Sequence, residues 1–175
     1  MDHNQTMNVY PAADGFIAQF TVVETETKKT NLSDGLEMIV ILDRSGSMGQ
    51  NVQRLVQTII PKALNNMGIP NDHKIHLITF DSVLDYYHLS STELISCAIQ
   101  ARGVTQMTSA ILKLDNLLST MVDKDVRILT ISDGDLHDQT QTVTKASDVF
   151  NKYSGKINCS SHAIRYSTSS SQPDT

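Results

Sequence analysis

The apolar residues of this chain fall into two kinds of pattern that alternate along the sequence. Largely apolar runs, typical of strands buried on both faces, occupy residues 36–42, 75–80 and 126–131, and residues 157–164 are expected to form a last strand. Between them, apolar residues recur every three or four positions, which predicts amphipathic helices over residues 52–67, 107–121 and 143–153. The alternation of buried strands with helices predicts an α/β fold, in which a mostly parallel sheet carries helices on both faces.

Short local signals refine this pattern. Only Asp81 and Ser82 separate the run at 75–80 from a further strand at 83–89, and so short a link predicts that this pair is antiparallel. Ser90 and Glu93 have the spacing of a capping box, which predicts a short helix continuing to Ile99. Pro61 predicts a kink in the helix at 52–67, and Gly68 predicts its end.

Both ends of the chain differ from the middle. The opening residues, to about Gly15, are polar and predict irregular structure, whereas Phe16–Val23 is rich in strand-forming residues. Residues 24–35 form a polar connector, and Ser167–Ser171 is a low-complexity stretch expected to be disordered. We therefore expect an N-terminal extension with one strand over 1–35, one domain over 36–166, and a Ser-rich tail over 167–175.

Composition limits the possible classes of protein. The 175 residues are enough for one domain with a sizeable core, and the net charge of -5 argues against binding to a phosphate backbone. Two cysteines, Cys97 and Cys159, could form one disulfide, although their sparse use favours free buried thiols. The polar start and the lack of any run of about 20 apolar residues predict a cytoplasmic protein without membrane insertion, unless a signal peptide has been lost.

Oxygen-bearing side chains gather where strands end. Asp43, Ser45 and Ser47 follow directly after the apolar run at 36–42, while Thr105 and Asp133 occupy matching strand-end or loop positions further along. In open parallel sheets, binding sites form at the carboxyl ends of strands, near a switch in strand order. Hard oxygen donors with little charge suit Mg²⁺, Mn²⁺ or Ca²⁺ better than zinc or copper.

Asp43-Arg44-Ser45-Gly46-Ser47, with Thr105 and Asp133, resembles the metal-ion-dependent adhesion site of the von Willebrand factor A (vWA) domain family. The resemblance covers about residues 36–165 and implies a Rossmann-like, doubly wound sheet with one antiparallel edge strand. It implies that Ser45, Ser47 and Thr105 coordinate the ion directly, and that Asp43 and Asp133 act largely through water and hydrogen bonds.

The resemblance also implies a function, and the chain departs from the family's pattern in places. It implies a protein-binding module, in which the bound cation, most simply Mg²⁺, accepts an Asp or Glu carboxylate from a protein partner. Val104 stands where the family usually has a second glycine, and Arg44 occupies a variable position. After the strand at 157–164 the family usually continues, so the resemblance implies a domain shortened at its C-terminal end.

Other interpretations remain open. The strand-end Ser and Asp residues could simply cap the following helix. A metal-dependent hydrolase and a scaffold module of a larger complex, such as a chelatase or ubiquitin-pathway protein, are the alternative functions. We assign no catalytic residue and expect no enzyme activity, because no general base is evident. Asp135 and Asp138 are interpreted as loop and helix-cap residues, and His137 as a surface histidine. The oligomeric state is not predicted.

Overall fold

The computed structural model of the protein describes residues 5–12, 15–22, 35–134 and 136–166. The chain divides into two compact units, residues 1–31 and 32–175, and each is described by itself.

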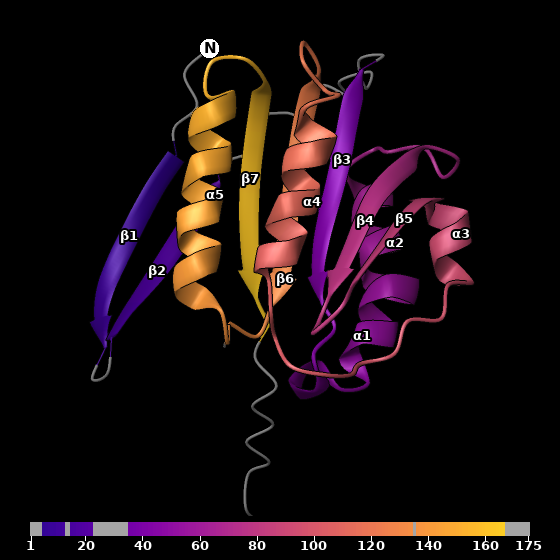
Figure 1. Cartoon of the computed structure of the whole chain (residues 1–175), viewed down its shortest axis with the longest axis horizontal. Helices are drawn as coiled ribbons and strands as arrows, with labels where there is room; N and C mark the ends of the chain where they lie inside the picture. Colours follow the sequence, from indigo (N-terminus) through magenta and orange to yellow (C-terminus); the bar gives the residue numbers. More distant parts are fainter. Residues whose placement is uncertain (1–4, 13–14, 23–34, 135, 167–175) are drawn as a thin grey trace, which may run out of the picture. The chain divides into compact units, whose positions relative to one another are not determined.

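The second unit is built on a five-stranded sheet with the order β5-β4-β3-β6-β7 (Figure 1). The strands are β3 (Leu36–Asp43), β4 (Lys74–Phe80), β5 (Leu84–Ser90), β6 (Asp125–Ser132) and β7 (Asn158–Arg165). Neighbouring strands are parallel except β5, which pairs antiparallel with β4 at one edge. The predicted fold class is confirmed, including the antiparallel edge strand.

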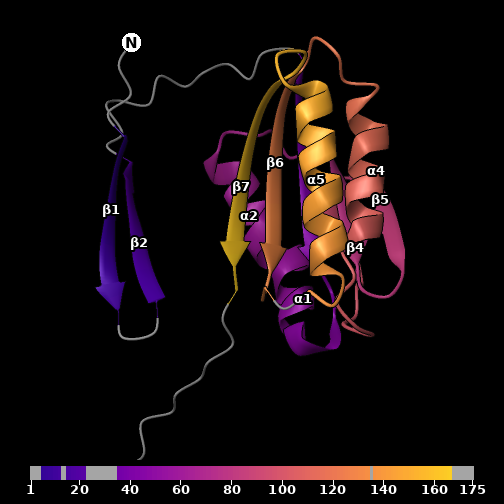
Figure 2. The same ribbon diagram turned by 60° about the vertical axis from the view of Figure 1, so that its left-hand side comes forward.

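Helices cover both faces of this sheet (Figure 2). One face carries α1 (Asn51–Arg54), η2 (Leu55–Ile59), α2 (Ile60–Asn66) and α3 (Ser91–Ile95), and the other carries α4 (Thr108–Leu118) and α5 (Gln139–Tyr153). Because successive side chains of a strand point to opposite faces, β3 contributes Val40 and Leu42 to one core and Ile39 and Ile41 to the other. Burial on both faces is the reason that this strand is apolar almost throughout.

The helix predicted over 52–67 is present but interrupted. A five-residue π-helical segment, η2, separates α1 from α2, and Pro61 stands in the first turn of α2. Proline has no N–H to donate to the preceding turn, so the hydrogen-bond pattern changes just before it. Gly68, with φ of +76°, ends the helix as expected.

The capping box at Ser90 is confirmed, but its helix is shorter than predicted. Ser90 Oγ accepts from the Glu93 N–H, and the Glu93 carboxylate accepts from the Ser90 N–H. The helix ends at Ile95 rather than Ile99. Side chains from α1 and η2 supply the later backbone partners, because Gln53 and Gln57 donate to the Cys97 carbonyl and Gln53 accepts from the Ile99 N–H.

The two cysteines are free thiols, as the sequence favoured. The expectation that both are buried is wrong, because Cys97 is half-buried and Cys159 is exposed. Cys159 lies on β7, which is an edge strand of the five-stranded sheet in the part of the chain that the structure describes.

The first unit contains a β-hairpin. Strands β1 (Gln5–Ala12) and β2 (Gly15–Val22) pair antiparallel in a two-stranded sheet, with Ala12 opposite Gly15. The strand predicted at Phe16–Val23 is confirmed, whereas the prediction of irregular structure before it, and so of one strand in this segment, is wrong. Thr6-Met7-Asn8-Val9 alternates polar and apolar residues, a strand signal that the polar composition obscured. Most of the predicted connector, 24–34, and the Ser-rich tail lie outside the described residues.

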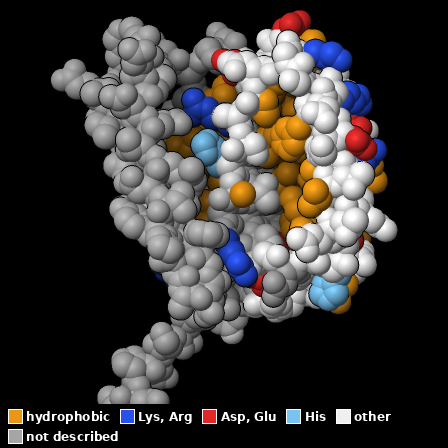
Figure 3. Space-filling view, turned by 90° about the vertical axis from the view of Figure 1, so that its left-hand side faces the viewer, with side chains coloured by type: hydrophobic (Ala, Val, Ile, Leu, Met, Phe, Trp, Pro, Cys, Tyr) orange, Lys and Arg blue, Asp and Glu red, His pale blue; other side chains and the backbone are white. Residues whose placement is uncertain are grey.

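Strand β7 ends the sheet, and all eight of its residues are exposed. Figure 3 shows apolar side chains gathered on this side of the molecule. A hollow of about 240 Å³ lies here, lined by Leu118, Phe150, Tyr153, Ser154, Gly155, Ile157 and Cys159. In the part of the chain that the structure describes, the helices are all too short or too polar to cross a bilayer.

Candidate metal centre

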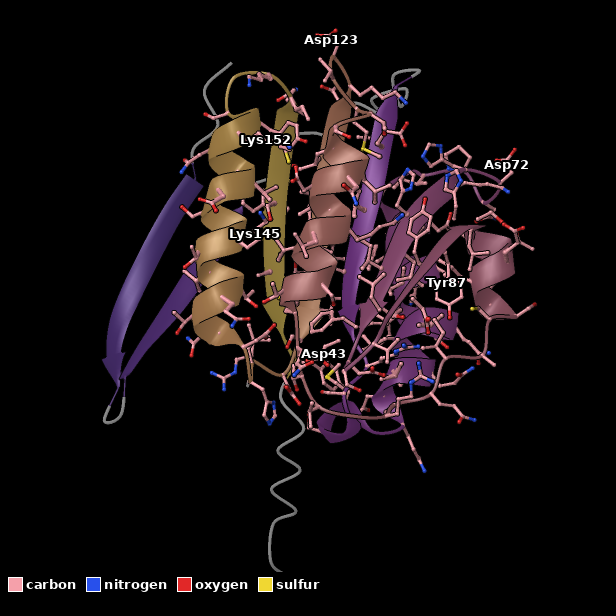
Figure 4. The ribbon with its side chains drawn as sticks, in the orientation of Figure 1. Asp43, Asp72, Tyr87, Asp123, Lys145 and Lys152 are labelled. Carbon is pink, nitrogen blue, oxygen red and sulfur yellow. The ribbon has the colours of Figure 1, made fainter. Side chains whose placement is uncertain are left out.

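The predicted site residues lie on three loops at the carboxyl ends of the parallel strands. We call residues 43–49, 101–107 and 132–138 the carboxyl-end loops. Asp43 is the last residue of β3, and Figure 4 shows it at the end of the sheet opposite Asp123. Because β3 and β6 are parallel neighbours, with Leu42 opposite Ile131, the residues that follow them emerge side by side.

Asp43 is fully buried and both of its carboxylate oxygens accept hydrogen bonds. Oδ1 accepts from the Ser45 N–H at 2.8 Å, and Oδ2 accepts from Ser132 Oγ at 2.7 Å. The first bond folds the chain back after β3, and the second joins the end of β3 to the end of β6. Ser132 Oγ in turn accepts from the Gly134 N–H at 3.1 Å. Asp43 therefore organises two loops through hydrogen bonds.

The two serines of the motif face each other. Ser45 is buried and Ser47 is exposed, and their Oγ atoms lie 3.0 Å apart. The short 3₁₀ turn η1 (Gly46–Met48) creates this arrangement, because the Met48 N–H donates to the Ser45 carbonyl and curls the chain. Two hydroxyl oxygens from one loop are thus directed to one place.

Backbone hydrogen bonds bring the Thr105 loop to this place. The Gly46 N–H donates to the Gly103 carbonyl at 3.1 Å, and the Arg102 N–H donates to the Arg44 carbonyl at 2.8 Å. On the other side, the His137 N–H donates to the Thr105 carbonyl at 2.9 Å. Thr105 is 3% exposed. All three carboxyl-end loops are therefore joined around it.

Asp133 supplies the remaining predicted oxygen. It follows β6 and is half-buried, and its Oδ1 is buried with no hydrogen-bond partner among the described residues. Buried polar atoms in native proteins are nearly always paired, so an unpaired carboxylate oxygen calls for an explanation such as a bound ion or water.

The donor set suits a hard divalent cation. Hydroxyls of Ser45, Ser47 and Thr105, with carboxylates of Asp43 and Asp133, provide oxygen only, which fits Mg²⁺, Mn²⁺ or Ca²⁺. Among residues 35–134 and 136–166 there is no group of three or more His, Cys, Asp or Glu side chains that could hold a metal. An ion at the carboxyl-end loops would therefore depend on the hydroxyl oxygens.

Two residues with roles at these loops were missed by sequence reasoning. Ser132 carries the bond from β6 to Asp43, although only its position before Asp133 marked it in the sequence. Arg44, interpreted as a variable position, is 4% exposed and lies 3.0 Å from the buried carboxylate of Asp81. An arginine in an otherwise apolar and hydroxyl-rich stretch was the available signal.

Asp138 is a helix-cap residue, as expected, but it caps a different helix. Its carboxylate accepts from the N–H groups of Met107 and Thr108, at the start of α4, rather than from its own helix α5. Burial would raise the pKa of Asp138, but the hydrogen bonds from Thr108 and Met107 outweigh it and lower the pKa. Asp138 thus joins the Thr105 loop to the Asp133 loop. His137 is exposed, as predicted for a surface histidine.

Several solved structures resemble this chain in fold. The manganese-loaded TRAP protein of Plasmodium vivax matches with a TM-score of 0.53 and 16% identity, over 74% of this chain and 57% of that chain. A von Willebrand factor type A structure from Catenulispora acidiphila matches with a TM-score of 0.52 and 13% identity, over 85% of this chain and 35% of that chain.

A third similar structure is an aerotolerance-related membrane protein from Bacteroides fragilis NCTC 9343. It matches with a TM-score of 0.50 and 22% identity, over 73% of this chain and 66% of that chain. No protein-family model and no curated protein matches the sequence. The chain spans less than two thirds of each of the three structures. The fold is that of the vWA domain.

Proposed function

We propose that this domain is a metal-dependent protein-binding module. In this proposal a divalent cation is held by Ser45, Ser47 and Thr105, with Asp43 and Asp133 acting through hydrogen bonds and water. The cation then accepts an Asp or Glu carboxylate from a protein partner. The observation that carries the proposal is the joining of three oxygen-bearing loops at one end of the sheet by the bonds of Asp43, Gly46 and His137.

The chemistry of the donors supports binding of an anionic group. Hydroxyl groups are neutral, so a cation that they hold keeps most of its charge and attracts a further anionic ligand. Asp43 already accepts two hydrogen bonds, which leaves its oxygens less able to neutralise a cation directly. A divalent cation is further supported by the similarity in fold to a manganese-loaded protein.

We propose binding rather than catalysis, and a protein rather than a nucleic acid as the partner. The net charge of -5 disfavours a phosphate backbone. The exposed Ser47 lets a partner reach the site, while Ser45 and Thr105 are buried and therefore fixed in position. A scaffold role in a larger assembly is compatible with the same chemistry.

Thermal unfolding in Mg²⁺, Mn²⁺ and Ca²⁺ tests the metal site. A cation that binds only the folded domain stabilises it by about 2.7 kcal/mol at a hundred times its dissociation constant. We expect the cation to raise the melting temperature of the wild type, and we expect this increase to be lost in Ser47→Ala. Ser160→Ala, which removes an exposed hydroxyl from β7, is the matched control and keeps the rise. Equal responses of the wild type and Ser47→Ala would contradict the assignment.

The binding function needs a second measurement. Pull-down with the metal-loaded domain should recover a protein that is lost with EDTA and with Ser47→Ala but kept with Ser160→Ala. A phosphatase and esterase assay on the same sample should give no turnover that depends on the cation. Cation-dependent hydrolysis would favour the alternative of a hydrolase.

A further inference from the structure

A buried ion pair adjoins the residues of the candidate metal centre. Arg44, between Asp43 and Ser45, is 4% exposed, and Asp81, which follows β4, is fully buried. Arg44 Nε lies 3.0 Å from Asp81 Oδ2, and its Nη1 lies 2.5 Å from Oδ2 of the partly exposed Asp85. Arg44 thus extends from the first carboxyl-end loop to the turn between β4 and β5.

Asp81 is held by more than one partner. Arg102 Nε, from the Thr105 loop, also lies 3.0 Å from Asp81 Oδ2. The other carboxylate oxygen accepts from the Val83 N–H. A buried charge that loses its partner is strongly destabilising, so these contacts hold each other in place.

The Thr105 loop packs directly on this pair. The Arg102 N–H donates to the Arg44 carbonyl, and the Gln106 N–H donates to the Asp81 carbonyl. Between them, Gly103 has φ of +67°, and a Cβ added there would lie only 2.8 Å from Ser82 Oγ and 3.4 Å from Asp81 Cβ. The loop therefore contacts both residues of the pair through backbone atoms on either side of Thr105.

We propose that Arg44 and Asp81 are positioning residues, which hold the Thr105 loop against the Ser45 loop before any cation binds. A cation would then meet a preformed set of oxygens instead of having to order the third loop. The effect on cation affinity rests on the proposed function. The prediction that this pair holds the Thr105 loop does not rest on the proposed function, and it can be tested in metal-free protein.

Amide hydrogen exchange in metal-free protein tests whether Arg44 and Asp81 hold the Thr105 loop in place. In Asp81→Asn, the amides of Gly46, Arg102 and Gln106 should exchange at least about tenfold faster than in the wild type, because their loop opens locally. Asp85→Asn is the matched control: it removes the same charge from the same cluster at a residue 39% exposed, and these amides should keep their protection. Unchanged exchange in Asp81→Asn would overturn the proposal.

Cation affinity separates positioning from a purely structural role. At a temperature well below melting, Asp81→Asn should bind Mg²⁺ about tenfold more weakly than the wild type, as residues that orient ligands usually do. A lower melting temperature with unchanged exchange and unchanged Mg²⁺ affinity would make the pair structural and overturn the proposal. Faster exchange in a protein whose wild type shows no Mg²⁺ response would support the loop-holding role and contradict the proposed function.

A second variant covers the case in which Asp81→Asn does not fold. Arg44→Lys keeps the positive charge, but lysine lacks the planar fork that reaches both Asp81 and Asp85. It should show the same faster exchange at Arg102 and Gln106, with a smaller loss of stability. Full protection of these amides in Arg44→Lys would count against the proposal.

Discussion

Two polar clusters lie at opposite ends of the same sheet, and they differ in whether their polar groups are paired. The first consists of the carboxyl-end loops. The second, which we call the amino-end cluster, consists of Glu37, His76, Tyr86, His88 and Lys124. His76 Nδ1 lies 2.8 Å from Tyr86 OH, and His76 Nε2 lies 3.1 Å from Glu37 Oε2. Lys124 donates to the other oxygen of Glu37, and the ring of His88 stacks on that of His76.

The polar groups of Glu37, His76, Tyr86 and Lys124 in the amino-end cluster are hydrogen-bonded to one another. Burial would raise the pKa of Glu37, but the hydrogen bonds from Lys124 and His76 outweigh burial and lower the pKa. An ionised Glu37 requires His76 Nε2 to donate, so Nδ1 of a neutral ring accepts from the Tyr86 hydroxyl. Burial raises the pKa of Tyr86, which keeps the phenol protonated for this bond.

The carboxyl-end loops leave oxygens available. Ser45 and Ser47 share one hydrogen bond between two hydroxyls, and Asp133 Oδ1 is buried without a partner among the described residues. A paired cluster stabilises the fold, whereas an incompletely paired one suits a ligand that completes it. The incomplete pairing therefore favours ligand binding at the carboxyl-end loops and not at the amino-end cluster, and substitutions can test that division.

The largest effect is expected at Asp43. Asp43→Ala leaves the Ser45 N–H and the Ser132 hydroxyl without their buried acceptor, and each unpaired group costs about 1–3 kcal/mol. Asp43→Asn keeps one acceptor oxygen and the shape of the side chain, so it should stay close to the wild type in stability. Chemical denaturation without metal should rank the two variants in this order.

Both Asp43 variants should lose the stabilisation by Mg²⁺, because neither retains the charge. Asp72→Asn, at an exposed position away from the loops, is the control and should retain it. If Asp43→Asn binds Mg²⁺ like the wild type, the charge of Asp43 has no part in the site.

The second-largest effect is expected on the pH dependence of stability, through the amino-end cluster. Burial lowers the pKa of His76 from its ordinary value of 6.5, the carboxylate of Glu37 partly opposes this, and the neighbouring His88 and Lys124 add to it. The unfolded chain therefore binds a proton more readily than the folded one. Stability is full above pH 6.5 and falls as the pH drops through the window below it, by at most about 1.4 kcal/mol per pH unit.

Denaturation curves from pH 7.5 to 5 measure this effect. His76→Gln, which cannot titrate, should have a flatter pH profile than the wild type. Its Mg²⁺ affinity at pH 7.5 should equal that of the wild type, because the amino-end cluster lies at the other end of the sheet. A change in Mg²⁺ affinity would break the division between the two ends.

The smallest effect is expected at Asp138. Loss of a capping carboxylate costs about 1 kcal/mol, so Asp138→Ala should lower the free energy of unfolding by roughly this amount. The amides of Met107 and Thr108 should lose protection from hydrogen exchange, because their acceptor is removed. Asp148→Ala, at an exposed position of α5, is the control and should leave both amides protected. Equal protection in both variants would show that the cap does not hold the start of α4.

Local pattern predicted much of the framework. Largely apolar runs identified β3, β4 and β6, because a strand buried on both faces cannot alternate, and the strand predicted at 157–164 is present as β7. The two-residue link at Asp81–Ser82 predicted the antiparallel edge strand, and Ser90 with Glu93 predicted the start of α3. The positions of Asp43 and Ser45 after β3, and of Asp133 after β6, followed from the same pattern, whereas Thr105 lies in the loop between α3 and α4 and was assigned through the resemblance to the vWA metal site.

Contacts between distant residues were not predictable from local pattern. Helix α3 stops early because Gln53 and Gln57, about 40 residues away in sequence, bond to the backbone around Cys97. Asp138 stands at the start of α5, where a local cap is expected, yet its side chain bonds to the start of α4. In both cases a partner from another element competes with the local one.

The sequence by itself determined the fold class and the oxygen donors, because buried strands, strand ends and hydroxyl-rich loops are local properties of a chain. Only the tertiary structure decided how those donors are paired. Arg44 resembled a variable loop residue, and its burial against Asp81 arises because the ends of β3 and β4 meet in the sheet. Whether a polar side chain is satisfied depends on neighbours that folding brings together, and that distinguishes the amino-end cluster from the carboxyl-end loops.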